Sequence, residues 1–259
     1  MDINLKGKNA LVCGSTAGIG NAIANELAEM GANVILLARN KEKLSKCMAK
    51  LTKTESQEHS YLVADFSKID TVRKAVASIK KPINILINNT GGPPAGAITA
   101  ATITEFTAAL EMHLLCNHVL VQGVQEGMIK SGYGRIINII STSVKQPLNG
   151  LGVSNTVRGA VANWSKTMAN ELGVYGITVN NVLPGATATE RLSGIVANNA
   201  KKTGKSESEV LKGMEAQVPM NRIAQPKEVA AAAAFLASPA ASYINGINLP
   251  VDGGRTGCL

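Results

Sequence analysis

The feature that most constrains the fold is an unbroken alternation of two patterns along the chain. Short runs rich in apolar and β-branched residues predict buried strands, and the longer stretches between them have helical spacing. The expected strands are Asn9–Cys13, Asn33–Ala38, Ser60–Ala64, Ile83–Ile87, Arg135–Ile140, Thr178–Leu183 and Gly246–Pro250. The expected helices are Ile19–Met30, Lys41–Lys53, Ile69–Ile79, Thr104–Lys130, Leu151–Val174 and Pro226–Ala237. Strands that alternate with helices form βαβ units, so we expect an α/β fold with a doubly wound sheet of about seven parallel strands flanked by helices.

The composition fits a single domain of this kind. Of the 259 residues, 45% are hydrophobic but only 3% are aromatic, so the core must be aliphatic. That favours helices packed on a buried parallel sheet. No linker or repeat interrupts the chain, so we expect one domain over residues 1–259. Residues 189–224 differ, being polar and weakly periodic. We interpret them as a mobile substrate lid, the alternative being a variable surface excursion.

Several classes of protein are excluded or disfavoured by charge and cysteine usage. The N-terminus lacks a signal layout, and the longest apolar run, Val229–Ala237, is too short to span a bilayer. Cys13, Cys47, Cys116 and Cys258 have no metal-site spacing, so reduced structural thiols and no bound metal are expected. The net charge of +8 comes from scattered lysines that fit solvated helix faces, or else attraction of an anionic ligand. Aromatic residues are not interleaved with them, which argues against nucleic acid. We therefore expect a cytoplasmic protein that binds neither membrane nor nucleic acid.

A glycine-rich segment between the first strand and the first helix predicts a Rossmann-like nucleotide site. It reads Cys13-Gly-Ser-Thr-Ala-Gly-Ile-Gly20, and its glycines allow the backbone to approach a pyrophosphate at the helix N-terminus. Arg39 and Asn40 follow the second strand, where the adenosine ribose lies in such folds. An arginine there suits the 2′-phosphate of NADP(H), so we favour NADP(H) over NAD(H). Ala17 argues the other way, since many NADP-binding chains carry a second basic residue there.

Further motifs complete a family resemblance. They are Asp65 at the end of the third strand, Asn88-Asn-Thr-Gly91, Gly134-Arg-Ile-Ile-Asn-Ile-Ile-Ser141, Asn180-Asn-Val-Leu-Pro-Gly185 and Val251-Asp-Gly-Gly254. With the glycine-rich segment they resemble the classical short-chain dehydrogenase/reductases, in particular the β-ketoacyl-acyl-carrier-protein reductase-like branch, over nearly the whole chain. The resemblance implies hydride transfer between a nicotinamide cofactor and a carbonyl or hydroxyl group. The implied cofactor contacts are Gly14, Ser15, Thr16, Gly18, Ile19, Gly20, Arg39, Asn40, Asp65, Phe66, Asn89, Thr90, Gly91, Arg158, Pro184, Gly185, Thr187 and Thr189.

The catalytic positions of the family are mostly substituted. Its serine is retained as Ser141, with Ser143 as a nearby alternative. The position of its tyrosine, thirteen residues on, holds Ser154, and the lysine position, four further, holds Arg158. The family's asparagine on the preceding long helix is replaced by His113. The implied catalytic set is therefore Ser141, Ser154, Arg158 and His113, with a degenerate Tyr-x-x-x-Lys motif.

These substitutions leave open which group would donate the proton that carbonyl reduction needs. A serine hydroxyl is a far weaker acid than a phenol, and loss of general acid catalysis costs about 10²–10⁴-fold. Arg158 keeps the positive charge and can bond ribose hydroxyls, but it cannot donate its proton. We interpret His113 as a buried structural residue; the alternative is a substitute acid with a pKa of about 6.5, aided by Asn117 one turn away. Ser154 and Arg158 represent either drift at a dead site or a pocket repurposed for an anion.

Two functions follow. The first is an NADP(H)-linked oxidoreductase, 3-oxoacyl reductase-like and of low activity, for a small carbonyl or alcohol substrate with an acyl-thioester as one candidate. The second is an inactive NADP(H)-binding pseudoenzyme that acts as a sensor or partner subunit. The resemblance also implies a homodimer or homotetramer through the long helices. An apolar stripe on the second of them fits this, unless it packs on its own sheet: Val157, Val161, Trp164, Met168 and Leu172.

Overall fold

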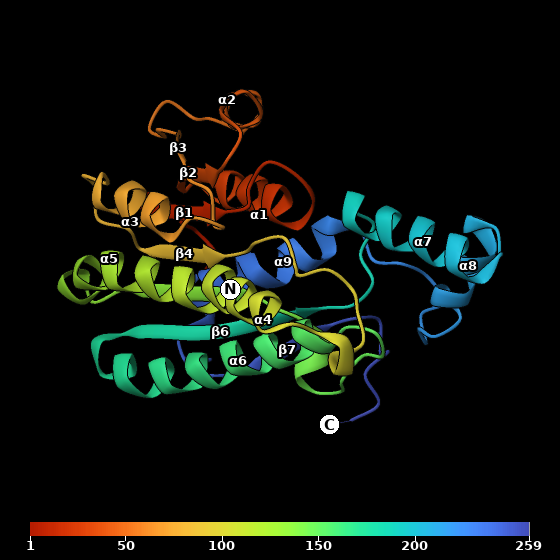
Figure 1. The fold of residues 1–259 in the computed structure, drawn as a ribbon. Helices are drawn as coiled ribbons and strands as arrows, with labels where there is room; N and C mark the ends of the chain where they lie inside the picture. The colour runs from red at the N-terminus through yellow and green to blue at the C-terminus, as the bar shows by residue number, and fades with distance from the viewer. Residues whose placement is uncertain (259) are drawn as a thin grey trace.

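Seven parallel strands form one sheet in a computed structural model that describes residues 1–258. The order is β3-β2-β1-β4-β5-β6-β7, and Figure 1 shows the sheet within its helices. The strands are β1 (Asn9–Cys13), β2 (Asn33–Ala38), β3 (Ser60–Val63), β4 (Ile85–Asn88), β5 (Gly134–Ile139), β6 (Ile177–Pro184) and β7 (Asn248–Val251). Winding reverses between β1 and β4, so a crevice for ligands opens at the carboxyl ends of these two strands. The predicted doubly wound α/β fold is confirmed.

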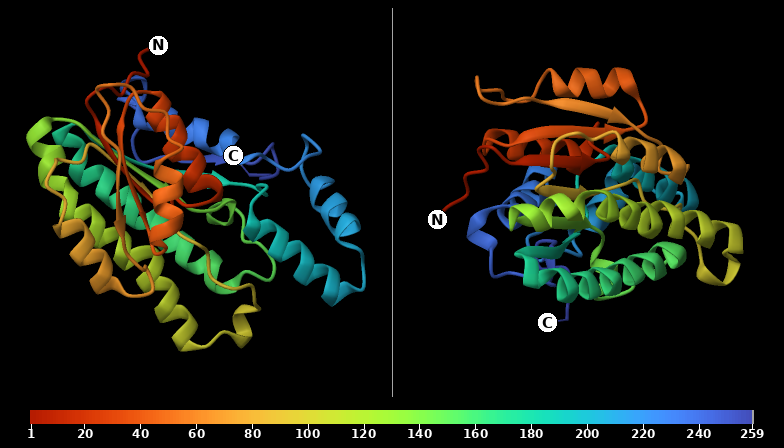
Figure 2. Two further views of the ribbon diagram at one scale, coloured as in Figure 1. Left: turned by 90° about the horizontal axis from the view of Figure 1, so that it is seen from above. Right: turned by 90° about the vertical axis from the view of Figure 1, so that its left-hand side faces the viewer.

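Helices cover both faces of the sheet and make a three-layer domain, as the two views of Figure 2 show. One face carries α1 (Gly18–Glu29), α2 (Lys41–Met48) and α9 (Pro226–Ala237), and the other carries α3 (Ile69–Ala77), α4 (Ile103–Leu110), α5 (Cys116–Ser131) and α6 (Gly152–Leu172). Successive residues of β1 point to opposite faces. Val12 packs with α1 and α9, whereas Leu11 packs with α3, α5 and α6. The core is aliphatic on both sides, as the composition predicts.

A row of asparagines crosses the carboxyl half of the sheet. Asn88, Asn138, Asn181 and Asn248 stand in register on β4, β5, β6 and β7. Each side-chain amide donates to the next side-chain carbonyl, over 2.8, 2.9 and 2.8 Å. Asn138 is fully buried and also donates to Ser165 Oγ of α6 over 3.2 Å. We call these four residues the asparagine ladder. It ties four strands together by side chains in addition to the backbone ladder.

The sequence predicts one continuous helix over Thr104–Lys130, and this prediction is wrong in the middle of that range. The structure divides it into α4, a π-helical turn η2 (Glu111–Leu115) and α5. The Cys116 N–H donates to the carbonyl of Glu111, five residues back, which is the π pattern. Such turns insert one residue into a helix and often lie at functional sites. No residue in this stretch is a poor helix former, so the sequence carries no sign of it.

Helix α2 was predicted to reach Lys53 but ends at Met48. Beyond it, the N–H groups of Lys50 and Leu51 donate to carbonyls three residues back, so the chain tightens into turns. These turns carry Leu51 into the core, where it is buried beside Leu44. The remaining short elements are the 3₁₀ turns η1 (Ile98–Ala100), η3 (Thr142–Val144), η4 (Gly173–Tyr175) and η5 (Pro239–Ala241).

Residues 189–224 contain two helices that were not predicted, α7 (Glu190–Thr203) and α8 (Glu207–Glu215). Figure 1 shows them projecting beyond the carboxyl end of the sheet. They have a small cluster of their own, in which Leu192, Val196 and Ile223 are buried. A capping box of Ser206 and Glu209 begins α8, and this spacing is a signal that could have been read from the sequence.

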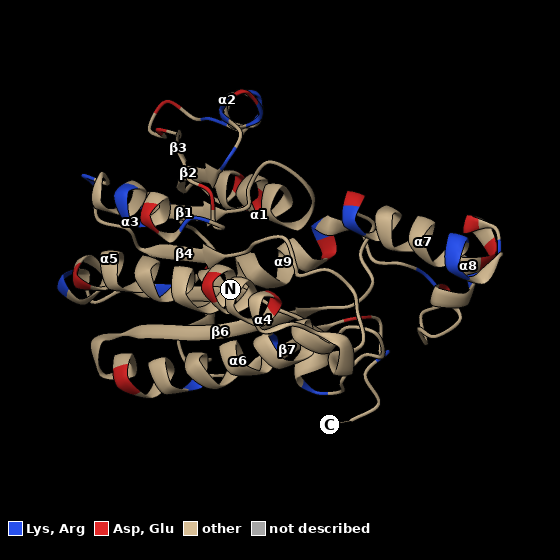
Figure 3. Ribbon diagram, in the orientation of Figure 1, with Lys and Arg blue, Asp and Glu red and all other residues tan. Residues whose placement is uncertain are grey.

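Charge is spread over the helices rather than gathered on one face, as Figure 3 shows. The four ion pairs among residues 1–258 are largely exposed, so each contributes little to stability. No described helix combines the length and the apolar character needed to cross a membrane.

Candidate active site

The glycine-rich loop lies against the end of β4 so tightly that side chains are excluded. A Cβ on Gly14, whose φ is +58°, would lie 2.5 Å from the carbonyl oxygen of Asn89. A Cβ on Gly20 would lie 2.3 Å from the carbonyl oxygen of Gly14. The Asn89 amide donates to the carbonyls of Cys13 and Gly14, over 3.2 and 3.3 Å. Asn89 thus clamps the loop in a shape that only these glycines allow.

The N-terminus of α1 is left without a side-chain cap. Its N-cap is Ala17, and its first turn contains no acidic residue. Helices α3 and α6 also lack a side-chain cap, whereas Thr102, Thr189 and Ser206 cap α4, α7 and α8 with their hydroxyls. The unpaired N–H groups of a helix N-terminus and its dipole attract phosphate. The glycine-rich loop and the uncapped N-terminus of α1 therefore fit the pyrophosphate of a dinucleotide.

Several residues predicted to contact the cofactor also hold the loop and its surroundings in place. The buried Ser15 hydroxyl accepts from the Leu37 N–H over 3.1 Å. Ile19 packs on the core beside α9, and Phe66 is buried among the side chains of the opposite face. The carbonyl of Thr16 accepts from Cys47 Sγ over 3.5 Å. The predicted cofactor contacts of Ser15, Thr16, Ile19 and Phe66 stay predictions, and the backbone groups of the loop are the ones these interactions leave free.

Arg39 and Asp65 flank the far end of the crevice. Arg39 is exposed and takes part in none of the ion pairs among residues 1–258. Asn40 uses its side chain to cap α2, accepting from the Lys43 N–H over 2.8 Å. The Ser67 N–H and hydroxyl donate to Asp65 Oδ1, which lowers the pKa of Asp65, and the charge of Arg39 lowers it further. Asp65 is thus a fixed carboxylate, whereas Arg39 is free to meet an anion.

The turn after β6 returns the chain to the glycine-rich loop. Pro184 ends β6, and a Cβ on Gly185 would lie 2.8 Å from the Cα of Asp252. Thr187 Oγ1 donates to the Gly185 carbonyl over 3.1 Å. Thr189 caps α7, and its methyl group lies 3.0 Å from the position of a Cβ on Gly18. The structure therefore brings the predicted contacts on both sides of the crevice together.

His113 lies on the π turn, and it contacts Thr90. Its Nδ1 is 2.7 Å from Thr90 Oγ1. The side chain is 2% exposed, and Nε2 is buried with no partner among residues 1–258. Burial lowers the pKa of His113 to about 2, and the charges of Arg158 and Arg191 act in the same direction. A neutral imidazole argues against the substitute-acid alternative and favours a buried, hydrogen-bonded histidine, and the role of His113 stays a prediction.

The lowered pKa predicts a pH-dependent stability. Because unfolded His113 takes up a proton below pH 6.5 and folded His113 does not, its contribution to stability is complete above that pH and is lost as the pH falls. Between pH 7 and pH 4.5 the wild type should lose roughly 2 kcal/mol more free energy of unfolding than His113→Asn. Urea unfolding of both proteins at the two pH values measures this. Parallel losses in the two proteins would contradict it.

Ser141 follows β5, and Arg158 of α6 is hydrogen-bonded to the last residue of that strand. Ser141 Oγ accepts from the Ser143 N–H over 3.1 Å, which leaves its own proton free, while Ser143 is buried behind it. Arg158 is 8% exposed and donates from Nη1 to the Ile139 carbonyl over 3.2 Å. Burial and the charge of Arg191 lower the pKa of Arg158 to about 10, so it stays protonated at neutral pH. Ser154 is buried one turn before Arg158 on α6.

Sequence reasoning missed a second arginine at this site. Arg191 is the second residue of α7, and its Nη2 donates to the Pro93 carbonyl over 3.2 Å. A Cβ on Gly92 would lie 2.4 Å from its Nη1, so the guanidinium rests on the backbone that follows β4. No motif marks this residue, because its position depends on how α7 returns to the sheet.

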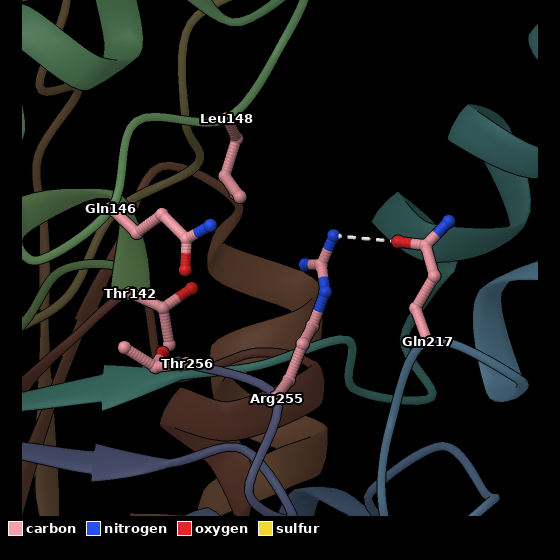
Figure 4. A pocket seen from close by; sticks show the side chains of 6 residues that line it. All are labelled: Thr142, Gln146, Leu148, Gln217, Arg255 and Thr256. Atoms are coloured by element: carbon pink, nitrogen blue, oxygen red, sulfur yellow. Dashed lines mark hydrogen bonds between the residues drawn. The ribbon is translucent and has the colours of Figure 1, made fainter. Parts of the chain in front are cut away.

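A polar pocket of about 200 Å³ opens next to Ser141, and Figure 4 shows its lining. Thr142, Gln146 and Leu148 come from the loop after β5. Gln217 follows α8, and Arg255 donates to it over 2.9 Å from the C-terminal segment beside Thr256. None of these residues was predicted. Among residues 1–258, no group of three or more histidine, cysteine, aspartate or glutamate side chains could hold a metal ion.

The apolar stripe on α6 packs within its own chain, against the sheet and against α4 and α5. Four of its five members are buried within the chain: Val157, Val161, Met168 and Leu172. Trp164 is half-buried, and its Nε1 lies 3.4 Å from His118 Nδ1. The stripe is therefore no argument for an oligomer, and the predicted homodimer or homotetramer stays a prediction.

Comparison with known proteins decides the family. Residues 14–256 match the family model described as enoyl-(acyl carrier protein) reductase. A solved structure described as a short chain dehydrogenase/reductase family protein superposes with a TM-score of 0.84 at 30% identity, covering 97% of this chain and 99% of that one. This chain belongs to the short-chain dehydrogenase/reductase family.

Other members of the family are similar over their full length. The chain is 35% identical over 254 residues to 3-oxoacyl-[acyl-carrier-protein] reductase FabG of Vibrio cholerae, covering 97% of this chain and 98% of that protein. It superposes on L-sorbose reductase from Gluconobacter frateurii complexed with NADPH and L-sorbose, with a TM-score of 0.92, 30% identity and 100% of both chains covered. The predicted family resemblance is confirmed. The roles assigned to single residues stay predictions.

Proposed function

We propose that this short-chain dehydrogenase/reductase is an NADP(H)-linked oxidoreductase that acts on a carbonyl or hydroxyl group of a small-molecule substrate. The observation that carries the proposal is the uncapped N-terminus of α1 beside the loop at Gly14 and Gly20, in the crevice that also holds Ser141 and Arg158. The NADPH complex of L-sorbose reductase and the acyl-carrier-protein reductase of Vibrio cholerae support it. A 3-oxoacyl thioester is one candidate substrate.

Arg39 supports the choice of NADP(H). It is exposed, free of ion pairs and placed after β2, where a 2′-phosphate would lie. The pyrophosphate would take the N–H groups of the loop and of the first turn of α1. When bound, the cofactor supplies or accepts the hydride.

Within the crevice, the side chains orient the carbonyl and stabilise charge. The free proton of Ser141 can be donated in a hydrogen bond to a carbonyl oxygen. A hydrogen bond from Ser141 to the oxyanion that develops there would stabilise it, and such stabilisation is strong where water is excluded. Neither Ser154 nor the neutral His113 is an acid of suitable pKa, so we propose that water delivers the proton. This predicts a slower reaction than a tyrosine acid would give.

The lid, the assembly and the location belong to the same proposal. We propose that residues 189–224 close over the substrate, that the single domain assembles as a homodimer or homotetramer, and that the protein is cytoplasmic. Emission from Trp164, the only tryptophan, would report dissociation on dilution.

Fluorescence titration with NADPH and NADH tests the proposal. NADPH should bind at least about tenfold more tightly, since a lost phosphate–arginine contact costs about 1.5–3 kcal/mol. Arg39→Asp should abolish that preference, whereas Arg73→Asp, a matched change on α3, should keep it.

NADPH should then be consumed with ketones or 3-oxoacyl thioesters. Binding without consumption on any of them would instead support the inactive nucleotide-binding alternative, and failure to bind either cofactor would contradict both.

A further inference from the structure

Arg158 carries a buried charge that the chain itself does not balance. The side chain is 8% exposed, yet its one hydrogen bond among residues 1–258 goes to the Ile139 carbonyl. A guanidinium has five N–H donors. None of the ion pairs among the described residues includes it. An unpaired buried cation is unfavourable, so a counterion from outside the chain is expected.

Arg191 brings a second cation to the same space. Its guanidinium lies on the backbone at Gly92 and donates to Pro93, and no carboxylate of residues 1–258 pairs with it. Burial is the main cause that lowers the pKa of both Arg158 and His113, and the charge of Arg191 acts in the same direction on each. Arg158 of α6 and Arg191 of α7 carry like charges, which repel each other in the absence of an anion.

His113 adds an unpartnered polar atom on η2, which packs against α6. Nε2 is buried without a partner, while Nδ1 contacts the Thr90 hydroxyl. If the Thr90 hydroxyl donates to Nδ1, the neutral ring carries its proton on Nε2 and can donate it to a ligand. The cluster then presents two guanidinium groups and an imidazole N–H, all of them hydrogen-bond donors, and it contains no acid.

We propose that Arg158 and Arg191 form a binding site for a carboxylate group of the substrate, with His113 as a third donor. The arginine fork matches the two oxygens of a carboxylate, which makes this pair specific as well as strong. The inference rests on the proposed function and narrows its substrate class to oxo acids and the corresponding hydroxy acids. It also gives Arg158 a use, in place of drift at a dead site.

The cofactor pyrophosphate is the other anion close by, because Thr189, two residues before Arg191, lies next to Gly18. The experiment must therefore separate the two anions. The probes are pyruvate, acetoacetate and levulinate, each compared with its neutral amide. Binding is measured by calorimetry on the protein saturated with NADP⁺, which cannot reduce them, so that the readout does not depend on turnover.

At least one of the acids should bind about tenfold or more tightly than its amide. Arg191→Met should remove that preference, Arg191→Lys should keep part of it, and Arg73→Met should leave it unchanged. Affinity for NADP⁺ is measured for each variant, and it should stay within about threefold. If none of the acids is preferred over its amide, or if Arg191→Met weakens NADP⁺ but not the acid, this inference is overturned. Failure of the wild type to bind NADP⁺ would instead overturn the proposed function.

Discussion

Replacing Asn138 by alanine is expected to lower the free energy of unfolding by about 3 kcal/mol or more. Asn138 is fully buried at the centre of the asparagine ladder, between Asn88 and Asn181. Alanine would leave the Asn88 amide and the Asn181 carbonyl without their partners, and each such buried group costs about 1–3 kcal/mol. Ser165 would lose a bond as well. The measurement is urea unfolding followed by circular dichroism.

Two further variants separate the ladder from general effects of substitution. Asn163→Ala, at an exposed position of α6, should change stability by no more than about 0.5 kcal/mol. Asn138→Asp keeps the shape but replaces the donor by an acceptor that faces the Asn181 carbonyl, so it should destabilise at least as much as alanine. A loss below about 1 kcal/mol for both changes at Asn138 would show that the ladder is not a stabilising network.

Replacing Gly20 by alanine is expected to weaken NADPH binding by about 10- to 100-fold. The new Cβ would lie 2.3 Å from the Gly14 carbonyl and 2.5 Å from Asn89 Nδ2, so the loop must move. Overpacking of this kind costs about 1–3 kcal/mol, and a backbone shift misplaces the N–H groups that would hold the pyrophosphate. Fluorescence titration of NADPH measures the change.

The matched control is the same substitution in another helix. Gly213 of α8 has open space around it and is exposed, so Gly213→Ala should stabilise α8 by about 0.5–1 kcal/mol and leave NADPH affinity unchanged. Equal NADPH affinity for Gly20→Ala and the wild type would contradict the proposed cofactor site. Weaker binding in both variants would point to a global effect instead.

The strands and the glycine-rich loop could be predicted because their signals are local. Runs of β-branched residues mark strands, and a glycine triplet between a strand and a helix marks a pyrophosphate turn. The division of the helix at Glu111 and the end of α2 at Met48 could not be predicted. In both places the local residues favour a helix, and contacts made elsewhere decide where it breaks.

The catalytic site, too, could be predicted only in part from the sequence. The spacing from Ser141 places Ser154 and Arg158 in register on one helix face, which indicates where chemistry would occur. It says nothing of Arg191, which reaches the site only because α7 folds back toward Gly92. The contact of His113 with Thr90 joins residues that are 23 positions apart in the chain.

The sequence alone therefore determined the alternation of strands and helices, the nucleotide loop and the family, because each depends on residues that are neighbours in the chain. Only the tertiary structure decided the charge state of His113, the burial of Arg158 and the pairing of the asparagine ladder. A pKa depends on the burial and the charges that surround a group, and a ladder depends on strand register. Both arise from residues far apart in the sequence.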